Sequence, residues 1–172
     1  YTIADSCVVQ AGGDVRPRVT FSADSPSPAP PPEQALDAVF SQTPLRRDEV
    51  FVTGKLWNAN HGAGKVEMAC RKTLRDLRLK QLDLYLIHWP VAGANRGAAV
   101  TPSLRETWQA MEALVDAGLV KAIGLSNFSV KKAKDVLEYA RVRPSVMQVS
   151  PSGGDDKVAA QLCYTWVSLW SS

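Results

Sequence analysis

The sequence contains no long hydrophobic run and no cluster of basic residues at its amino terminus. No stretch of about 18 consecutive apolar residues occurs, so a transmembrane helix is not expected. The opening YTIADSCVVQ lacks the basic region of a secretory signal peptide. We therefore expect a soluble protein, with the cytoplasm as its default location and an organelle as the alternative if the amino terminus is processed.

Cysteine is scarce, and its spacing argues against two common uses of this residue. Cys7, Cys70 and Cys163 include no C-x-x-C pair, so we expect neither a disulfide framework nor a metal site. No glycine-rich phosphate-binding motif follows an apolar run, which argues against a Rossmann or P-loop site. The 20 Lys and Arg residues are interspersed with 17 Asp and Glu residues, so the charge pattern does not indicate a nucleic-acid partner.

What the sequence does contain is an alternation of apolar runs and helical stripes. Runs of strand length lie at residues 50–53, 82–88, 120–125 and 146–149, and near-continuous hydrophobicity suits strands covered on both faces. Apolar residues recur at i, i+3 and i+4 across residues 66–77, 104–115 and 130–140, as in amphipathic helices. Ser103 and Glu106 form a capping box, and Gly118 follows that helix as a C-terminal cap. This alternation predicts an α/β fold with a parallel sheet, either doubly wound or closed as a barrel.

Proline is concentrated in one segment. Residues 24–33, DSPSPAPPPE, hold five of the eleven prolines, and such a run lacks most of the N–H groups that a helix or sheet needs. Because few residues precede this segment, we interpret it as an exposed inserted loop within a single domain of residues 1–172.

Polar residues follow several of the predicted strands. They are Asp5 after YTIA, Lys55 after VFVTG, His88 after LDLYLI, Ser126 and Asn127 after KAIGL, and Gln148 within VMQV. Taken singly, each is more simply a solvated loop residue or a hydrogen-bonded core group. Sites are built, however, where the carboxyl ends of parallel strands meet. A carboxylate beside a lysine, a histidine and paired amides suit the polar reduction of a carbonyl group.

Four segments carry a family resemblance. VFVTGKLWN, LDLYLIHWP, GLVKAIGLSNF and RPSVMQV resemble the aldo-keto reductases, in continuous order from about residue 48 to residue 149, and YTIADS resembles that family's second strand. The resemblance implies a (β/α)8 TIM barrel that binds NADPH across its carboxyl-terminal mouth. It also implies hydride transfer to an aldehyde or ketone by a tetrad of Asp, Tyr, Lys and His. By motif, Asp5, Lys55 and His88 match three members of that tetrad.

The resemblance extends to cofactor and substrate residues. By position, Ser126, Asn127 and Gln148 match the residues that bind the nicotinamide carboxamide, and Trp57 and Trp89 match aromatic residues of the substrate pocket. The terminal VSLWSS resembles the seventh strand, which implies that Trp170 stacks on the nicotinamide ring.

The tyrosine position departs from the family pattern. Gln10 stands where the resemblance implies the catalytic tyrosine, and an amide cannot deliver a proton near neutral pH. Tyr85 is no substitute, because strand alternation relative to His88 points it toward the helices. Two hypotheses therefore stay open. The chain is either an NADPH-dependent reductase of aldehydes and ketones, or a catalytically impaired derivative that serves as a structural or interaction subunit.

The length of the chain is short for the implied fold. A (β/α)8 barrel needs roughly 200 to 250 residues, and the pattern of this 172-residue chain accounts for about six of the eight strands. The first residue is Tyr rather than Met, so we expect either that something was removed upstream or that this sequence is not the whole translated product. Open sheet edges expose unpaired backbone groups. We therefore expect a partner chain, self-association or further residues to cover them.

Overall fold

The computed structural model describes residues 36–37, 40–91 and 102–148, together with the backbone of four short strands. These strands are β1 (Thr2–Ile3), β2 (Cys7–Val8), β3 (Arg18–Ser22) and β8 (Thr165–Trp166). The other elements are η1 (Arg47–Glu49), β4 (Phe51–Leu56), η2 (Asn58–Asn60), α2 (Lys65–Asp76), β5 (Leu82–Ile87), α3 (Leu104–Asp116), β6 (Val120–Ser126), α4 (Val130–Tyr139) and β7 (Val146–Gln148). The four apolar runs and three helical stripes expected from the sequence are therefore confirmed, with shifts at their ends.

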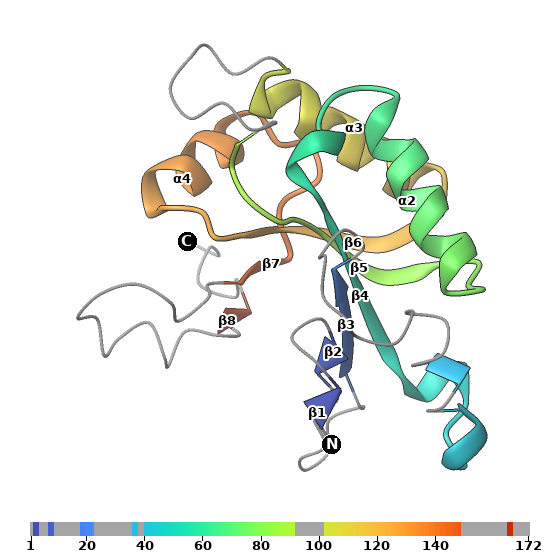
Figure 1. Cartoon of the computed structure of the whole chain (residues 1–172). Helices are drawn as coiled ribbons and strands as arrows, with labels where there is room; N and C mark the ends of the chain where they lie inside the picture. Colours follow the sequence, from blue (N-terminus) through green and yellow to red (C-terminus); the bar gives the residue numbers. More distant parts are fainter. Residues whose placement is uncertain are drawn as a thin grey trace.

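Six strands form one sheet in the order β3-β4-β5-β6-β7-β8. Neighbours from β3 to β7 run parallel, whereas β8 pairs antiparallel with β7. Helices α2, α3 and α4 lie together on one face of this sheet (Figure 1). Since the strand order never reverses, right-handed crossovers place successive helices on the same side, as in a barrel and unlike a doubly wound sheet. The sheet is a segment of a (β/α) barrel.

The structure corrects the expectation for the amino terminus. Strand β1, which lies within YTIA, pairs antiparallel with β2 in a separate two-stranded sheet, and β3 is the strand beside β4. In RVTFS of β3, apolar and polar residues alternate, which is the period of a strand with two different faces. Because this alternation leaves no continuous apolar run, the segment was not predicted as a strand. The assignment of YTIA to the main sheet was therefore wrong.

The sheet has six strands, but its outer members differ from the expected ones. The expected strand VSLWSS and its Trp170 lie outside the described residues, and the strand beside β7 is the antiparallel β8. Asp5, Gln10 and the proline-rich residues 24–33 also lie outside the described residues.

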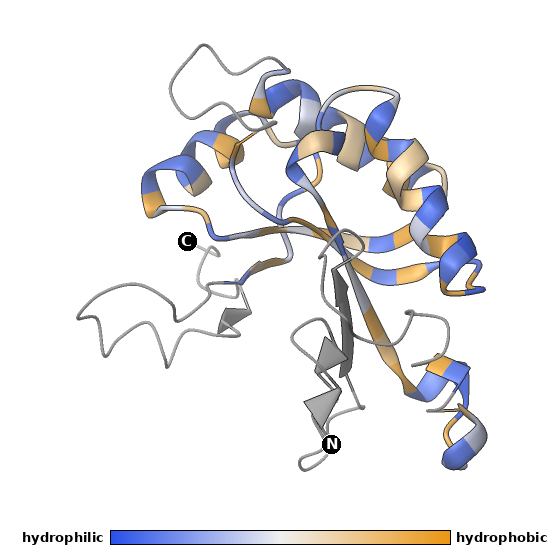
Figure 2. Cartoon of the chain, viewed as in Figure 1, coloured by the Kyte–Doolittle hydropathy of each residue, from blue (hydrophilic) through white to orange (hydrophobic). Residues whose placement is uncertain are grey.

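The helices cover the sheet with their apolar stripes, which Figure 2 shows as alternating orange and blue along α2, α3 and α4. Tyr85 of β5 and Trp108 of α3 are fully buried in this helix-facing core, together with Cys70 of α2. The expectation that Tyr85 points toward the helices is thus confirmed. None of the helices in the described ranges is long and apolar enough to cross a membrane.

A buried carboxylate ties the amino-terminal ends of β4, β5 and β6 together. One oxygen of Asp83 accepts a hydrogen bond from Lys121 Nζ at 2.6 Å, and the other accepts from Arg47 Nη2 at 2.8 Å and from the N–H of Val52 at 2.9 Å. Burial raises the pKa of Asp83, but these three hydrogen bonds outweigh that effect and leave the pKa below its ordinary value. Asp83 is therefore ionised and fully partnered.

Helices α2 and α3 end in the same backbone motif, although different residues occupy it. The N–H of Leu79 donates to Leu74 O at 2.9 Å after α2, and the N–H of Leu119 donates to Leu114 O at 3.0 Å after α3. This is the Schellman arrangement, which needs a left-handed residue at the preceding position. Gly118 has φ 68° after α3, confirming its expected role as a cap, whereas Arg78 has φ 53° after α2. A side chain at this position makes the backbone unfavourable.

We predict that Arg78→Gly stabilises the chain. Relief of the left-handed backbone is worth about 1 to 2 kcal/mol, and the greater freedom of glycine in the unfolded chain offsets about 0.5 to 1 kcal/mol of that gain. The Arg78–Asp37 ion pair is exposed and contributes little. The free energy of unfolding, measured by urea denaturation, should rise by about 0.5 to 1 kcal/mol.

The matched control is Arg78→Ala, which removes the same ion pair but keeps a Cβ atom at φ 53°. This variant should be no more stable than the parent chain. Equal stability of the alanine and glycine variants would show that the backbone conformation at residue 78 carries no measurable strain.

Candidate active site

Lys55 and His88 lie on the same face of neighbouring strands. Lys55 of β4 is in register with Leu86 of β5, and the N–H of His88 donates to Leu56 O at 3.1 Å. Because side chains alternate along a strand, His88 shares the face of Leu86 and Lys55, whereas Tyr85 belongs to the helix-facing core. Both candidate residues therefore lie on the barrel-interior face, at the carboxyl ends of β4 and β5.

Two tryptophans flank His88. The ring centroids of Trp57 and His88 are 5.1 Å apart at an interplanar angle of 61°, and those of His88 and Trp89 are 6.0 Å apart at 30°. Trp57 follows β4 directly and Trp89 is two residues beyond β5, so register brings the three rings together. Trp89 is 39% exposed. The group therefore offers an aromatic surface that a small apolar molecule can reach from solvent.

The side chain of Asn127 joins the ends of β5 and β6. Its Nδ2 donates to His88 O at 3.0 Å and to Ser126 Oγ at 3.1 Å, while its backbone N–H donates to Gln148 O at 2.8 Å. Asn127 has φ 59°, a left-handed conformation that asparagine tolerates better than most residues. One residue thus fixes the position of His88 relative to the next two strands.

Ser126 and Gln148 complete a polar group at the same edge. They are opposite each other in the register of β6 and β7, and Ser126 is fully buried. The buried Oε1 of Gln148 has no hydrogen-bond partner among the described residues. A buried carbonyl oxygen is stabilised by a donor. The N–H groups of a carboxamide would supply one, so the residues present fit the nicotinamide end of NADPH.

Burial controls the charges at this edge. It lowers the pKa of Lys55 below its ordinary value. Burial first, and the nearby positive charge of Lys55 second, lower the pKa of His88 to about 4. His88 is therefore neutral at pH 7, with one ring nitrogen able to donate and the other able to accept a hydrogen bond.

The structure brings seven of the predicted site residues to one edge of the sheet. They are Lys55, Trp57, His88, Trp89, Ser126, Asn127 and Gln148, whereas Asp5 and Trp170 lie outside the described residues. Within the described ranges, no group of three or more His, Cys, Asp or Glu residues could hold a metal ion. The arrangement places hydrogen-bonding side chains beside an aromatic surface.

Sequence reasoning missed the bridging role of Asn127 and the state of the second histidine. A single asparagine after a predicted strand gives a weak signal of left-handed backbone, and its bond to His88 O depends on cross-strand register.

His61, the second histidine, lies between η2 and α2 and is only 3% exposed. Burial lowers its pKa to about 4. Its Nε2 has no partner among the described residues.

The parallel strand order and the carboxyl-edge site define a barrel-type α/β protein, and comparison with known proteins specifies the family. Residues 29–161 match the Aldo/keto reductase family. The chain belongs to this family, and its fold is a partial (β/α)8 barrel of the aldo-keto reductase type.

Individual relatives agree with this assignment. The chain is 46% identical over 131 residues to aldose reductase B of Dictyostelium discoideum, which covers 67% of this chain and 42% of the relative. It is 53% identical over 117 residues to aldo-keto reductase family 1 member A1-A of Danio rerio, covering 61% and 36%. The chain therefore spans less than half the length of these curated relatives.

Solved structures show the same partial coverage. The aldose reductase of Giardia lamblia is 37% identical with a TM-score of 0.62, covering 69% of this chain and 43% of that protein. A Bombyx mori aldo-keto reductase solved in complex with NADP is 30% identical with a TM-score of 0.66, covering 76% and 43%.

We predict that the stability of the chain falls as the pH drops from 6.5 toward about 4, the pKa of both His61 and His88 in the folded state. In this range the unfolded chain binds protons that the folded chain does not, so acid favours unfolding. The stabilisation is fully present above pH 6.5 and is lost toward pH 4. For the buried His61 the loss corresponds to about 3 kcal/mol at most. Urea denaturation at a series of pH values measures it.

Single substitutions distinguish the contributions of the two histidines to this pH dependence, and these two are the only histidines in the chain. His61→Gln and His88→Gln should each flatten the dependence between pH 6.5 and 5, where most carboxylates remain ionised in both states. The comparison uses the slope, because either variant can change the absolute stability through packing. An unchanged slope in both variants would contradict the low pKa of these two histidines.

Proposed function

We propose that this chain carries the carbonyl-binding part of an NADPH-dependent reductase that converts aldehydes or ketones to alcohols. The observation that carries the proposal is the placement of neutral His88 between Trp57 and Trp89, on the same face as Lys55. This combines hydrogen-bond donors with an aromatic surface, as a carbonyl substrate requires. Membership of the aldo/keto reductase family supports the same chemistry.

Each residue of this group has a physical role in the proposal. A neutral His88 donates a ring N–H to the carbonyl oxygen and orients it without a full positive charge. Lys55 lies on the same face, and its charged form stabilises negative charge that develops on that oxygen. Trp57 and Trp89 bind the apolar part of the substrate and exclude water around it.

The polar group at β6 and β7 is assigned to the cofactor. Asn127 and Gln148 would hold the carboxamide of the nicotinamide ring, with Ser126 hydrogen-bonded to Asn127. Trp170 is proposed to stack on that ring by its motif alone. When bound, NADPH supplies the hydride that adds to the carbonyl carbon, and NADP-bound relatives support this choice of cofactor.

Protonation of the resulting alkoxide is the step of the proposed reaction that the residues of this site support least. Gln10 stands at the position where the resemblance implies a tyrosine, and a neutral amide is not a useful general acid. Asp5 enters the proposal only by motif, and the pairing of β1 with β2 instead of β4 argues against it. These two departures favour the second candidate function, a catalytically impaired subunit that retains binding or structural roles.

We predict that the purified chain oxidises NADPH very slowly in the presence of an aldehyde, and that Gln10→Tyr increases the rate. A positioned general acid contributes about 10²–10⁴-fold, so the increase should approach that range if the rest of the site is functional. Absorbance of NADPH at a saturating aldehyde concentration measures both rates.

His88→Ala serves as the control for this assay and should abolish whatever rate the parent chain has. Rapid turnover by the parent chain that disappears in His88→Ala would eliminate the impaired-subunit hypothesis. If neither the parent nor Gln10→Tyr shows turnover or binds NADPH, the proposed reductase function is wrong.

A partner that covers the sheet edges is also part of the proposal. β3 and β8 each have one hydrogen-bonded neighbour in the sheet, and an unpaired edge is prone to pair with another strand. We predict that the isolated 172-residue chain self-associates, and sedimentation velocity at several concentrations tests this. A monomer that unfolds cooperatively at all concentrations would contradict the prediction.

A further inference from the structure

Lys55 differs from the paired lysines of this chain in its surroundings. Lys121 donates to Asp83, Lys72 donates to Asp76, and Lys132 donates to a backbone carbonyl oxygen. Within the described ranges, Lys55 makes no hydrogen bond or ion pair, although it is only partly exposed at the end of β4. Its ammonium form is therefore desolvated without compensation from a described carboxylate.

The physical consequence is a larger uncharged fraction of the amine. Burial lowers the pKa of Lys55, and no described acidic group opposes this effect. An uncharged amine is a nucleophile, and desolvation in an apolar site is a recognised way to activate lysine toward carbonyl compounds. Neutral His88, on the same face, can accept and return a proton during such a reaction.

The neighbouring side chains determine which carbonyl compounds would react. The edge-on contact of Trp57 with His88 and the exposed ring of Trp89 present an aromatic surface beside the amine. Such a surface binds flat, apolar molecules better than charged or strongly hydrated ones. Aromatic and other apolar aldehydes fit this site.

We propose that Lys55 forms a Schiff base with apolar aldehydes that enter this site. The inference deepens the proposed function, since it rests on the same group of residues that is proposed to bind the carbonyl substrate. The nitrogen lone pair of Lys55 adds to the aldehyde carbon, and the first of the two amine protons moves from that nitrogen to the carbonyl oxygen, which gives a carbinolamine. The second amine proton then leaves the nitrogen as the hydroxyl departs as water, which forms the C=N bond, and no oxidant or reductant is consumed. His88 accepts each proton from the nitrogen and passes it to the oxygen.

This reaction provides a use for the site that needs neither tyrosine nor NADPH. Reduction of a carbonyl to an alcohol requires a general acid for the alkoxide, which Gln10 cannot supply. Imine formation instead requires an amine with a substantial uncharged fraction and a neutral group that can relay a proton. Burial enlarges the uncharged fraction of Lys55 and His88 is neutral, so the chain would capture aldehydes reversibly even where reduction is slow.

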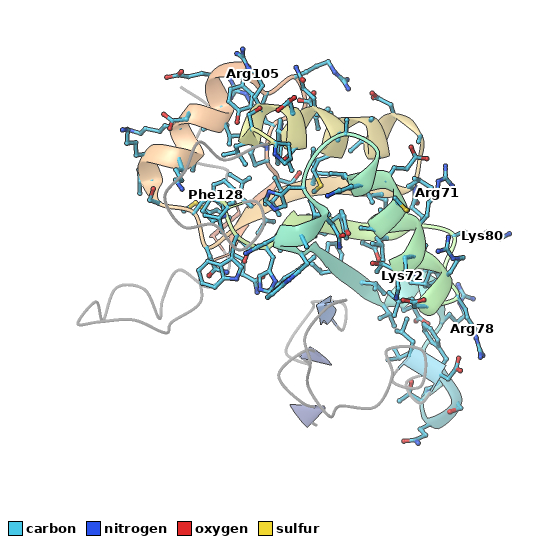
Figure 3. The ribbon with its side chains drawn as sticks, turned by 45° about the horizontal axis from the view of Figure 1, so that its top comes forward. Arg71, Lys72, Arg78, Lys80, Arg105 and Phe128 are labelled. Atoms are coloured by element: carbon cyan, nitrogen blue, oxygen red, sulfur yellow. The ribbon has the colours of Figure 1, made fainter. Side chains whose placement is uncertain are left out.

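The experiment traps the imine in the intact chain. The full chain is incubated at pH 7 with benzaldehyde and sodium cyanoborohydride, without NADPH, and the modified lysines are located and timed by peptide mass spectrometry. Lys55 should be modified severalfold faster than Lys80, because burial lowers the pKa of Lys55 and enlarges the uncharged fraction of its amine. Lys80 is exposed and points to solvent beyond α2 (Figure 3), and Lys121 is the ion-paired control.

Three variants sharpen the test. His88→Gln should slow the modification of Lys55 severalfold and leave that of Lys80 unchanged. Asp5→Asn and Asp24→Asn examine the two aspartates that follow β1 and β3 in the sequence. Neither should change the rate at Lys55. A large increase in either variant would show that a carboxylate holds Lys55 charged and would overturn the proposal.

The outcomes separate this inference from the proposed reductase function. Selective trapping at Lys55 supports the inference whether or not NADPH is oxidised in the separate assay. Equal or slower modification of Lys55 compared with Lys80 overturns the inference, and NADPH oxidation by the same preparation would then leave the reductase function standing. Acetophenone, a bulkier and less electrophilic ketone, should trap more slowly than benzaldehyde at Lys55.

Discussion

The ionised carboxylate of Asp83 fixes how three parallel strands lie against one another. It accepts hydrogen bonds from Arg47, Lys121 and the N–H of Val52, and therefore joins β4, β5 and β6 at their amino ends. A shift of one residue in the register would move every side chain of a strand to the other face. Lys55 would then face the helices, and the group around His88 would not form. The positions of the candidate site residues at the carboxyl edge therefore depend on this ion cluster at the amino edge.

Asn127 has the corresponding role at the carboxyl edge, but by a different physical means. It uses neutral hydrogen bonds and a left-handed backbone in place of buried charge. Neutral hydrogen bonds contribute about 1 kcal/mol each. Asp83 is 6% exposed, but the side chains of Arg47 and Lys121 are 33% and 54% exposed, so solvent partly screens the ion cluster at the amino edge. The two edges are therefore held by different interactions, and the groups that hold the carboxyl edge also face the site.

The sequence allowed the helices and central strands to be predicted because their signals are local. The capping box of Ser103 and Glu106 and the cap at Gly118 mark the ends of α3 within a few residues. β3 was missed because its apolar residues alternate with polar ones. Motifs identified the residues of the candidate site, but their contacts depend on register between strands about 30 to 40 residues apart, as the separation of Asn127 from His88 illustrates. No local pattern encodes such a contact.

The unreversed strand order has a consequence for how sequence changes act in this protein. An open sheet whose strand order reverses has a crevice at the reversal, and a ligand can be held there by the main chain. This sheet has no reversal, so a ligand must be held by side chains from several neighbouring strand ends. Substitutions in a single loop can therefore change substrate preference without any change in the helix-facing core.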